Sequence, residues 1–189
     1  MEKGKYVVNY ANQISVVRRP DQDKTKMQWE KPKGGWMKLN VDGSFDAQEG
    51  RGGIGMILRD NIGKAIFSSC RVLDGCSDAQ EAELLSCAEG IILVIQWTLL
   101  PIVVETDCLV ASQLIQSKEK DLSTLAHIVQ EVKRLLAGER EIIIQKIHCS
   151  QNHASHALAK ARSEFVYDFW LGDTCNFISH LICTDALVE

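Results

Sequence analysis

Residues 36–45 read WMKLNVDGSF, and this stretch opens with a period of two. The apolar side chains at positions 37, 39 and 41 alternate with those at 36, 38 and 40, which indicates a strand with one buried face. The turn-forming run Asp42, Gly43 and Ser44 follows directly. We therefore expect the first strand to end at Asp42 and to leave its carboxylate at the edge of a sheet.

Two more apolar runs follow, at residues 54–58 and 65–72, and Gly- and Asn-containing turns separate them. Three consecutive strands joined by short links predict an antiparallel meander.

The rest of the chain alternates between helical and strand patterns. Asp78 is a candidate N-cap with Glu81 three residues later, as in a capping box, and the helix it begins runs to about residue 97. Further strands are predicted at 102–107 and 141–147, and helices at 109–115, 122–136 and 152–165. The order predicts an α/β fold: a mixed five-stranded sheet, with a three-strand antiparallel meander plus two parallel strands, and helices on both faces.

Charge divides the chain into regions. Residues 1–35 hold eight Lys or Arg against four acids, a net charge of +4. Because the whole chain has a net charge of −4, residues 36–189 have a net charge of −8. We predict a basic N-terminal arm or linker at 1–35, a domain at 36–165 and a C-terminal extension at 166–189. The arm is equally consistent with a solubilising extension or with part of a larger protein.

Length and cysteine content set the class of protein. A chain of 189 residues with 46% hydrophobic residues fits one packed domain. Its seven cysteines form no Cys-x-x-Cys pair, its first residues show no secretory signal, and the apolar stretch at 90–104 is interrupted. We expect an intracellular monomer of the nucleus or cytoplasm with no membrane association.

Three acids occupy comparable positions: Asp42 ends the first strand, Glu83 lies in the first turns of the long helix, and Asp107 ends the fourth strand. If the first and fourth strands are neighbours, these carboxylates converge and repel one another, a repulsion that divalent cations relieve. Taken singly, each has a simpler interpretation: Asp42 as a turn former, Glu83 as a solvated helix position and Asp107 as an N-cap.

Several motifs resemble the type I ribonuclease H domain, in its plant reverse-transcriptase-like, retroelement-derived branch, over about residues 36–165. The residues that carry the resemblance are WMKLNVDGSF at 36–45, GGIGMILRD at 52–60, EAELL at 81–85, ETD at 105–107, and Asn152 followed by Ala157, Leu158 and Ala159.

The resemblance implies a metal-dependent endonuclease that cleaves the RNA strand of RNA–DNA hybrids and uses two Mg²⁺ or Mn²⁺ ions. By position, Asp42, Glu83 and Asp107 match the family carboxylates that hold the metal. Glu81 lies two residues from Glu83 and points to another side of the helix, so only one of the two can face the metal.

The chain departs from the family pattern where a fourth carboxylate is expected, because His156 occupies that position. His156 is a candidate catalytic residue, as a metal ligand or as a proton shuttle, and a purely structural role is an equal alternative. Cys149 stands where the family usually has an arginine.

Nucleic-acid contacts are predicted for Gly43, Ser44, Gly52, Gly53 and Asn152, through backbone approach and side-chain hydrogen bonds. The basic protrusion of some family members is not evident, and the basic arm could compensate for it. Two other functions stay open: a domesticated retroelement-derived nucleic-acid-binding domain with weak or no catalysis, and a structural or protein-interaction role on the same fold.

Overall fold

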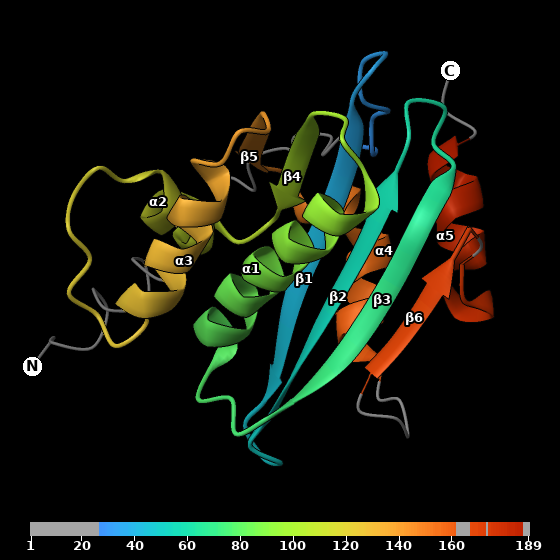
Figure 1. Cartoon of the computed structure of the whole chain (residues 1–189). Helices are drawn as coiled ribbons and strands as arrows, with labels where there is room; N and C mark the ends of the chain where they lie inside the picture. The colour runs from blue at the N-terminus through green and yellow to red at the C-terminus, as the bar shows by residue number, and fades with distance from the viewer. Residues whose placement is uncertain (1–26, 162–166, 173, 187–189) are drawn as a thin grey trace, which may run out of the picture.

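The computed structural model describes residues 27–161, 167–172 and 174–186 (Figure 1). Its strands are β1 (Met37–Asp46), β2 (Arg51–Arg59), β3 (Ala65–Asp74), β4 (Ile102–Thr106), β5 (Ile142–Lys146) and β6 (Tyr167–Leu171). Its helices are α1 (Ala79–Trp97), α2 (Leu109–Gln116), α3 (Ala126–Leu136), the 3₁₀ turn η1 (Cys149–Gln151), α4 (His153–Lys160) and α5 (Asn176–Ala186).

The six strands form one sheet in the order β5-β4-β1-β2-β3-β6. The pairs β1·β2 and β2·β3 are antiparallel and make the predicted meander, while β1·β4 and β4·β5 are parallel. The mixed α/β class is confirmed, and β1 lies beside β4, which is the arrangement that the convergence of the acids requires. The predicted count of five strands is wrong by one, because Tyr167–Leu171 pairs antiparallel with β3 and adds an edge strand.

Because side chains alternate along a strand, those of β1 point toward the helices on both faces of the sheet. Leu39 and Val41 face α1 in the larger apolar core, while Asn40 and Asp42 face the opposite side, where α4 lies. In Figure 1, α1 lies in front of the sheet, and α4 and α5 lie behind it. A smaller core of Ile57, Leu158 and Ile178 joins β2, α4 and α5.

Three element boundaries differ from the prediction. Strand β1 continues past Asp42 to Asp46, because the Asp46 carboxylate accepts backbone hydrogen bonds from Gln48 and Glu49 and places the turn there. Helix α3 begins at Ala126 rather than 122, and Leu122 is exposed. Helix α4 ends at Lys160, and residues 162–166 of the longer predicted helix lie outside the described residues.

Described residues on both sides of the predicted domain boundaries pack against the same sheet. Trp29 is 2% exposed and stacks on the guanidinium of Arg59, whose Cζ lies 3.4 Å from the ring centroid. Arg59 also pairs with Asp185 of α5 at 2.6 Å and donates to Asn40. We call residues 27–33, which lie against this cluster, the strap; the division at residues 35 and 165 stays a prediction.

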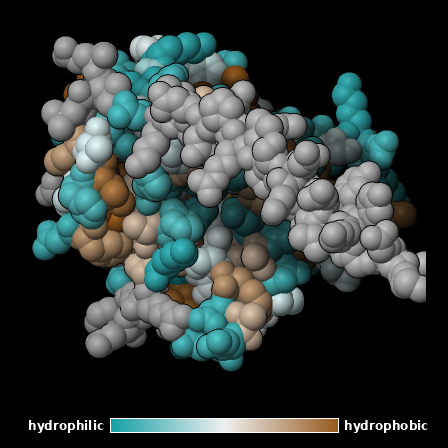
Figure 2. Space-filling model, turned by 180° about the vertical axis from the view of Figure 1, so that it is seen from behind, coloured by the Kyte–Doolittle hydropathy of each residue, from teal (hydrophilic) through white to brown (hydrophobic). Residues whose placement is uncertain are grey.

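The surface seen from behind carries hydrophilic side chains between separate apolar patches (Figure 2). Within the described ranges, no helix combines the length and the apolar character that crossing a membrane requires.

Candidate metal centre

Three carboxylates meet beside β1. One ligand atom from each of Asp42, Glu83 and Asp107 lies within 4.8 Å of the other two, although the residues come from β1, α1 and the end of β4. Asp42 is buried, and the other two side chains are half-buried. The pairing of β1 with β4 and the packing of α1 on β1 thus bring together residues that are distant in the sequence.

Gly43 allows Glu83 to reach Asp42. A Cβ atom at position 43 would lie 2.3 Å from the backbone nitrogen of Glu83, so only glycine lets α1 approach β1 this closely. The Gly43 backbone also hydrogen-bonds Glu83. Glu81 instead serves the helix end, because its backbone donates to Asp78, the N-cap of α1. Its carboxylate accepts from the Ser77 backbone rather than from that of Asp78, so only one of the two hydrogen bonds of the predicted capping box forms.

Asp107 is held by the side-chain amide of Asn152, the residue directly before α4. Cys108, not Asp107, is the N-cap of α2, since its sulfur accepts from the Ala111 backbone. The Asp107 carboxylate is therefore available to the cluster. The Asn152 side chain donates to Asp107 Oδ1 at 3.0 Å and to the Val41 carbonyl at 2.9 Å, and it is itself buried.

The cluster is electrostatically costly without a counter-charge. Burial, and then the negative charges of Glu83 and Asp107, raise the pKa of Asp42 to about 9. Burial and Asp107 raise the pKa of Glu83 to about 8. Among the described residues, no Lys or Arg forms an ion pair with any of the three acids. Protons or cations must therefore supply the missing positive charge.

The donor set fits a divalent cation. The Glu83 Oε2 atom is buried and has no hydrogen-bond partner among the described residues, so it is free to bind an ion. Three carboxylates offer only hard oxygen ligands, as Mg²⁺ and Mn²⁺ prefer. Asp42, Glu83 and Asp107 would hold such an ion.

His156 lies against the same cluster. Its Nδ1 atom is 2.9 Å from Asp42 Oδ2, and its side chain is 46% exposed. Partial burial and the nearby charge of Lys160 keep the pKa of His156 below its ordinary value. The imidazole is therefore mainly neutral at pH 7, and its contact with Asp42 is a hydrogen bond rather than an ion pair.

The residues predicted to contact nucleic acid have partners inside the domain. A Cβ on Gly53 or Gly55 would lie within 2.3 Å of the α4 backbone, and a Cβ on Gly52 would meet Cys76. The hydroxyl of Ser44 donates to the carbonyl of Ala159 in α4. The contacts of Ser44, Gly53 and Gly55 hold α4 against the sheet and so position His156. The nucleic-acid role of Gly43, Ser44, Gly52, Gly53 and Asn152 stays a prediction.

Two contributions to the site were not predicted from the sequence. Lys160 lies one helical turn beyond His156, and its charge lowers the pKa of both Asp42 and His156. Asn152, a predicted phosphate contact, also orients Asp107. The spacing of four between residues 156 and 160 could have indicated that Lys160 lies near His156. No local pattern indicated the contact between Asn152 and Asp107.

Solved structures with the same fold include ribonucleases H and a viral reverse transcriptase. RNase H1 from the archaeon Halobacterium salinarum is 17% identical, with a TM-score of 0.61, and the match covers 66% of this chain and 95% of that one. LC11-RNase H1 from compost, in complex with an RNA/DNA hybrid, is 17% identical, with a TM-score of 0.57 and coverage of 65% and 92%. Prototype foamy virus protease-reverse transcriptase is 16% identical, with a TM-score of 0.56 and coverage of 69% and 21%.

At these identities the likeness establishes a ribonuclease H-like fold. Residues 40–162 match the family model described as reverse transcriptase-like, and the chain therefore belongs to the reverse transcriptase-like family. Among curated proteins, no sequence match is found.

Proposed function

We propose that this protein is a metal-dependent ribonuclease of the ribonuclease H type, which cleaves the RNA strand of RNA–DNA hybrids. The convergence of Asp42, Glu83 and Asp107 within 4.8 Å carries the proposal. Membership of the reverse transcriptase-like family supports it, as does the likeness to LC11-RNase H1, which was solved with an RNA/DNA hybrid. We further propose a plant retroelement origin and a nuclear or cytoplasmic location.

Two Mg²⁺ or Mn²⁺ ions at the three carboxylates would supply the charge that stabilises the attacking and leaving oxygens of a phosphodiester. With the carboxylates ionised, Asp42 Oδ2 can only accept, so the Nδ1–H of His156 must donate to it. That hydrogen bond fixes the tautomer and leaves the lone pair on Nε2.

His156 then acts as the proton shuttle of the site. A water oxygen attacks the phosphorus and releases its proton to solvent, while the imidazole, which has taken a proton from solvent at Nε2, passes it to the 3′ oxygen as the bond from that oxygen to phosphorus breaks. The Asp42 carboxylate, 2.9 Å from Nδ1, stabilises the imidazolium during this transfer. The products are a 3′-hydroxyl and a 5′-phosphate.

Cleavage of a hybrid labelled separately on each strand tests the proposal. The full chain should cut only the RNA strand in Mn²⁺ or Mg²⁺, and Asp42→Asn should abolish the cleavage. Glu139→Gln removes an exposed carboxylate outside the cluster and serves as the matched control. Activity that survives Asp42→Asn, or cleavage of both strands, would overturn the assignment.

A second candidate is a nucleic-acid-binding domain with weak or no turnover, and His156 is the observation that favours it. An imidazole at this position adds no negative charge, so the site holds one carboxylate fewer than the ribonuclease H pattern that it resembles. Hybrid binding at low salt, without RNA cleavage in a single-turnover assay with either metal, would establish this function over the first.

A further inference from the structure

A pair of polar side chains precedes the acids on the same two strands. Strands β1 and β4 are parallel, and their register places Asn40 opposite Glu105. Side chains on one face of a strand recur at every second residue, so the next positions on this face are Asp42 and Asp107. Contacts that fix Asn40 against Glu105 therefore also fix the positions from which these two acids converge.

The carboxylate of Glu105 is held by two side chains of β1. Asn40 Nδ2 donates to Glu105 Oε2 at 2.9 Å, and Lys38 Nζ lies 2.7 Å from Glu105 Oε1. Asn40 is held in turn, because Arg59 donates to its Oδ1 atom at 2.8 Å. All four side chains are buried. Both oxygens of the β4 carboxylate are thus engaged by the neighbouring strand.

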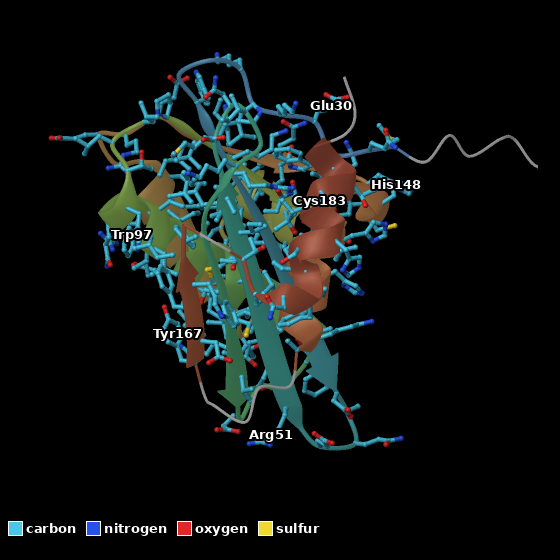
Figure 3. All side chains as sticks on the ribbon, turned by 90° about the vertical axis from the view of Figure 1, so that its right-hand side faces the viewer. Glu30, Arg51, Trp97, His148, Tyr167 and Cys183 are labelled. Carbon is cyan, nitrogen blue, oxygen red and sulfur yellow. The ribbon has the colours of Figure 1, made fainter. Side chains whose placement is uncertain are left out.

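The strap covers this polar network. Lys38 Nζ donates to the Glu30 carbonyl at 2.6 Å and lies 5.4 Å from the centroid of the buried Trp29 ring. Glu30 lies on the side of the sheet where α4 and α5 pack, away from Trp97 and Tyr167 (Figure 3). The ion pair beneath the strap is therefore shielded from water, and removing one partner would leave the other buried without its counter-charge.

The network balances its own charges. It contains the cations Lys38 and Arg59 and the acids Glu105 and Asp185, joined in two ion pairs. Among the described residues, the acids that converge as candidate ion ligands do not include Glu105. Its carboxylate already has a cation, so it differs from the three acids of the centre. Glu105 therefore holds two strands together instead of offering a ligand.

We propose that Glu105 is a positioning residue of the metal centre. Held by Lys38 and Asn40, its carboxylate fixes β4 against β1, so that Asp42 and Asp107 meet at a separation that one divalent cation can bridge. This inference rests on the proposed function and names the contacts that set the geometry of its site. Groups that orient metal ligands without touching the ion typically change metal affinity by about 10–100-fold when they are lost.

A charge-conserving variant tests the proposal. Glu105→Asp keeps the negative charge, but its carboxylate is one carbon shorter and cannot reach both Lys38 and Asn40. We expect Mn²⁺ affinity to fall about tenfold or more. The dissociation constant is measured by electron paramagnetic resonance on full-length protein, at a temperature where circular dichroism shows each variant to be folded.

A second variant separates position from charge. Lys38→Met removes a cation near the centre, and by charge alone this change would tighten Mn²⁺ binding. Loss of the Glu105 contact should instead weaken binding about tenfold. Leu73→Ala is the control, because it truncates a buried side chain of β3 and leaves the polar network intact. It should lower stability without changing Mn²⁺ affinity. If Lys38→Met does not fold, Glu105→Asp decides alone.

The outcomes separate the two proposals. A parent protein that binds no Mn²⁺ overturns the proposed function itself. Parent-like Mn²⁺ affinity in Glu105→Asp, or tighter binding in Lys38→Met, overturns the positioning role and leaves the proposed function intact. An equal loss of affinity in Leu73→Ala also overturns the positioning role, because lowered stability would then account for the effect.

Discussion

The Nδ1 atom of His156 lies 2.9 Å from Oδ2 of Asp42, which ties the exposed face of α4 to the most buried acid of the cluster. A neutral imidazole thus occupies the place where a further carboxylate would complete an all-oxygen site. The imidazole engages Oδ2, one of the two oxygens that the Asp42 carboxylate offers.

Replacing this imidazole by a carboxylate should strengthen Mg²⁺ binding. His156→Asp adds a hard ligand and a negative charge beside Asp42, so we expect Mg²⁺ affinity to rise at least about tenfold. The metal-free protein should become less stable, because a fourth acid adds repulsion. Isothermal titration with Mg²⁺ and urea unfolding in chelator measure the two effects. His156→Gln, which adds no charge, is the control, and equal Mg²⁺ affinity in both variants would contradict the expectation.

The stability of the metal-free protein should fall as pH rises. The pKa of Asp42 is raised from 3.8 to about 9 and that of Glu83 from 4.5 to about 8, so the folded state binds more protons than the unfolded state between these values. The stability that these two groups contribute is present below about pH 4 and is lost as the pH rises toward 9. Urea midpoints at pH 5, 7 and 9 in chelator measure this decline.

Adding Mn²⁺ should remove most of that decline, because the ion replaces the protons. Mn²⁺ binding at pH 7 should also release protons, detectable as a buffer-dependent binding enthalpy. A metal-free stability that rises from pH 5 to pH 9, with no proton release on binding, would contradict the raised pKa values.

Replacing Glu83 and replacing Glu81, both on α1, should have different effects on metal binding. Glu83→Gln removes a ligand from the cluster, so we expect loss of Mn²⁺ binding and of cleavage. Glu81→Gln alters only the helix cap, and should cost about 1 kcal/mol of stability or less while leaving Mn²⁺ affinity unchanged. Mn²⁺ binding by electron paramagnetic resonance distinguishes them, and equal losses in both variants would contradict the assignment.

Gly55 should not tolerate a side chain. A Cβ at this position would lie 2.2 Å from the Ala159 nitrogen and 2.4 Å from the Ser155 carbonyl oxygen, so Gly55→Ala must push α4 from the sheet. We expect a loss of about 2–3 kcal/mol in the free energy of unfolding. Gly34→Ala, at an open position, is the control. A stability loss no larger than that of Gly34→Ala would argue against the close packing of α4.

Breaking the buried ion pair between Arg59 and Asp185 should lower the free energy of unfolding more than breaking an exposed ion pair. Asp185→Asn leaves the fully buried guanidinium without its carboxylate, and we expect a cost of about 2–4 kcal/mol. Asp74→Asn breaks an exposed pair with Arg51 and should cost about 0.5 kcal/mol or less. Urea unfolding of the two variants makes the comparison, and similar small costs would show that α5 contributes little.

Local patterns predicted the elements that carry the acids. The alternation before Asp42, the N-cap Asp78 before α1 and the β-branched run before Asp107 each act within a few residues, so the sequence alone located these three elements, although β1 continues past its predicted end to Asp46. The order of a meander followed by crossovers permits β1 and β4 to be neighbours, and their pairing in the structure meets the condition on which the convergence of the acids depended.

Long-range contacts were harder to predict. Strand β6 pairs with β3, which lies about a hundred residues earlier in the chain. No nearby turn or alternation therefore indicated this strand. Glycines at 43 and 53 fit sites of close phosphate approach, but close helix packing also excludes a Cβ. The sequence cannot distinguish a close approach of phosphate from a close approach of a helix, since both require glycine.

The cluster around Arg59 has a consequence for synthesis of the protein. The carboxylate that neutralises this buried guanidinium lies 126 residues later in the chain. At roughly 5–20 residues per second, a ribosome needs on the order of ten seconds to reach it. During that interval a nascent chain holds Arg59 without the charge that permits its burial. The sheet can therefore close over this position only after α5 has been synthesised, and a chain truncated before α5 would be left exposed to chaperones and proteases.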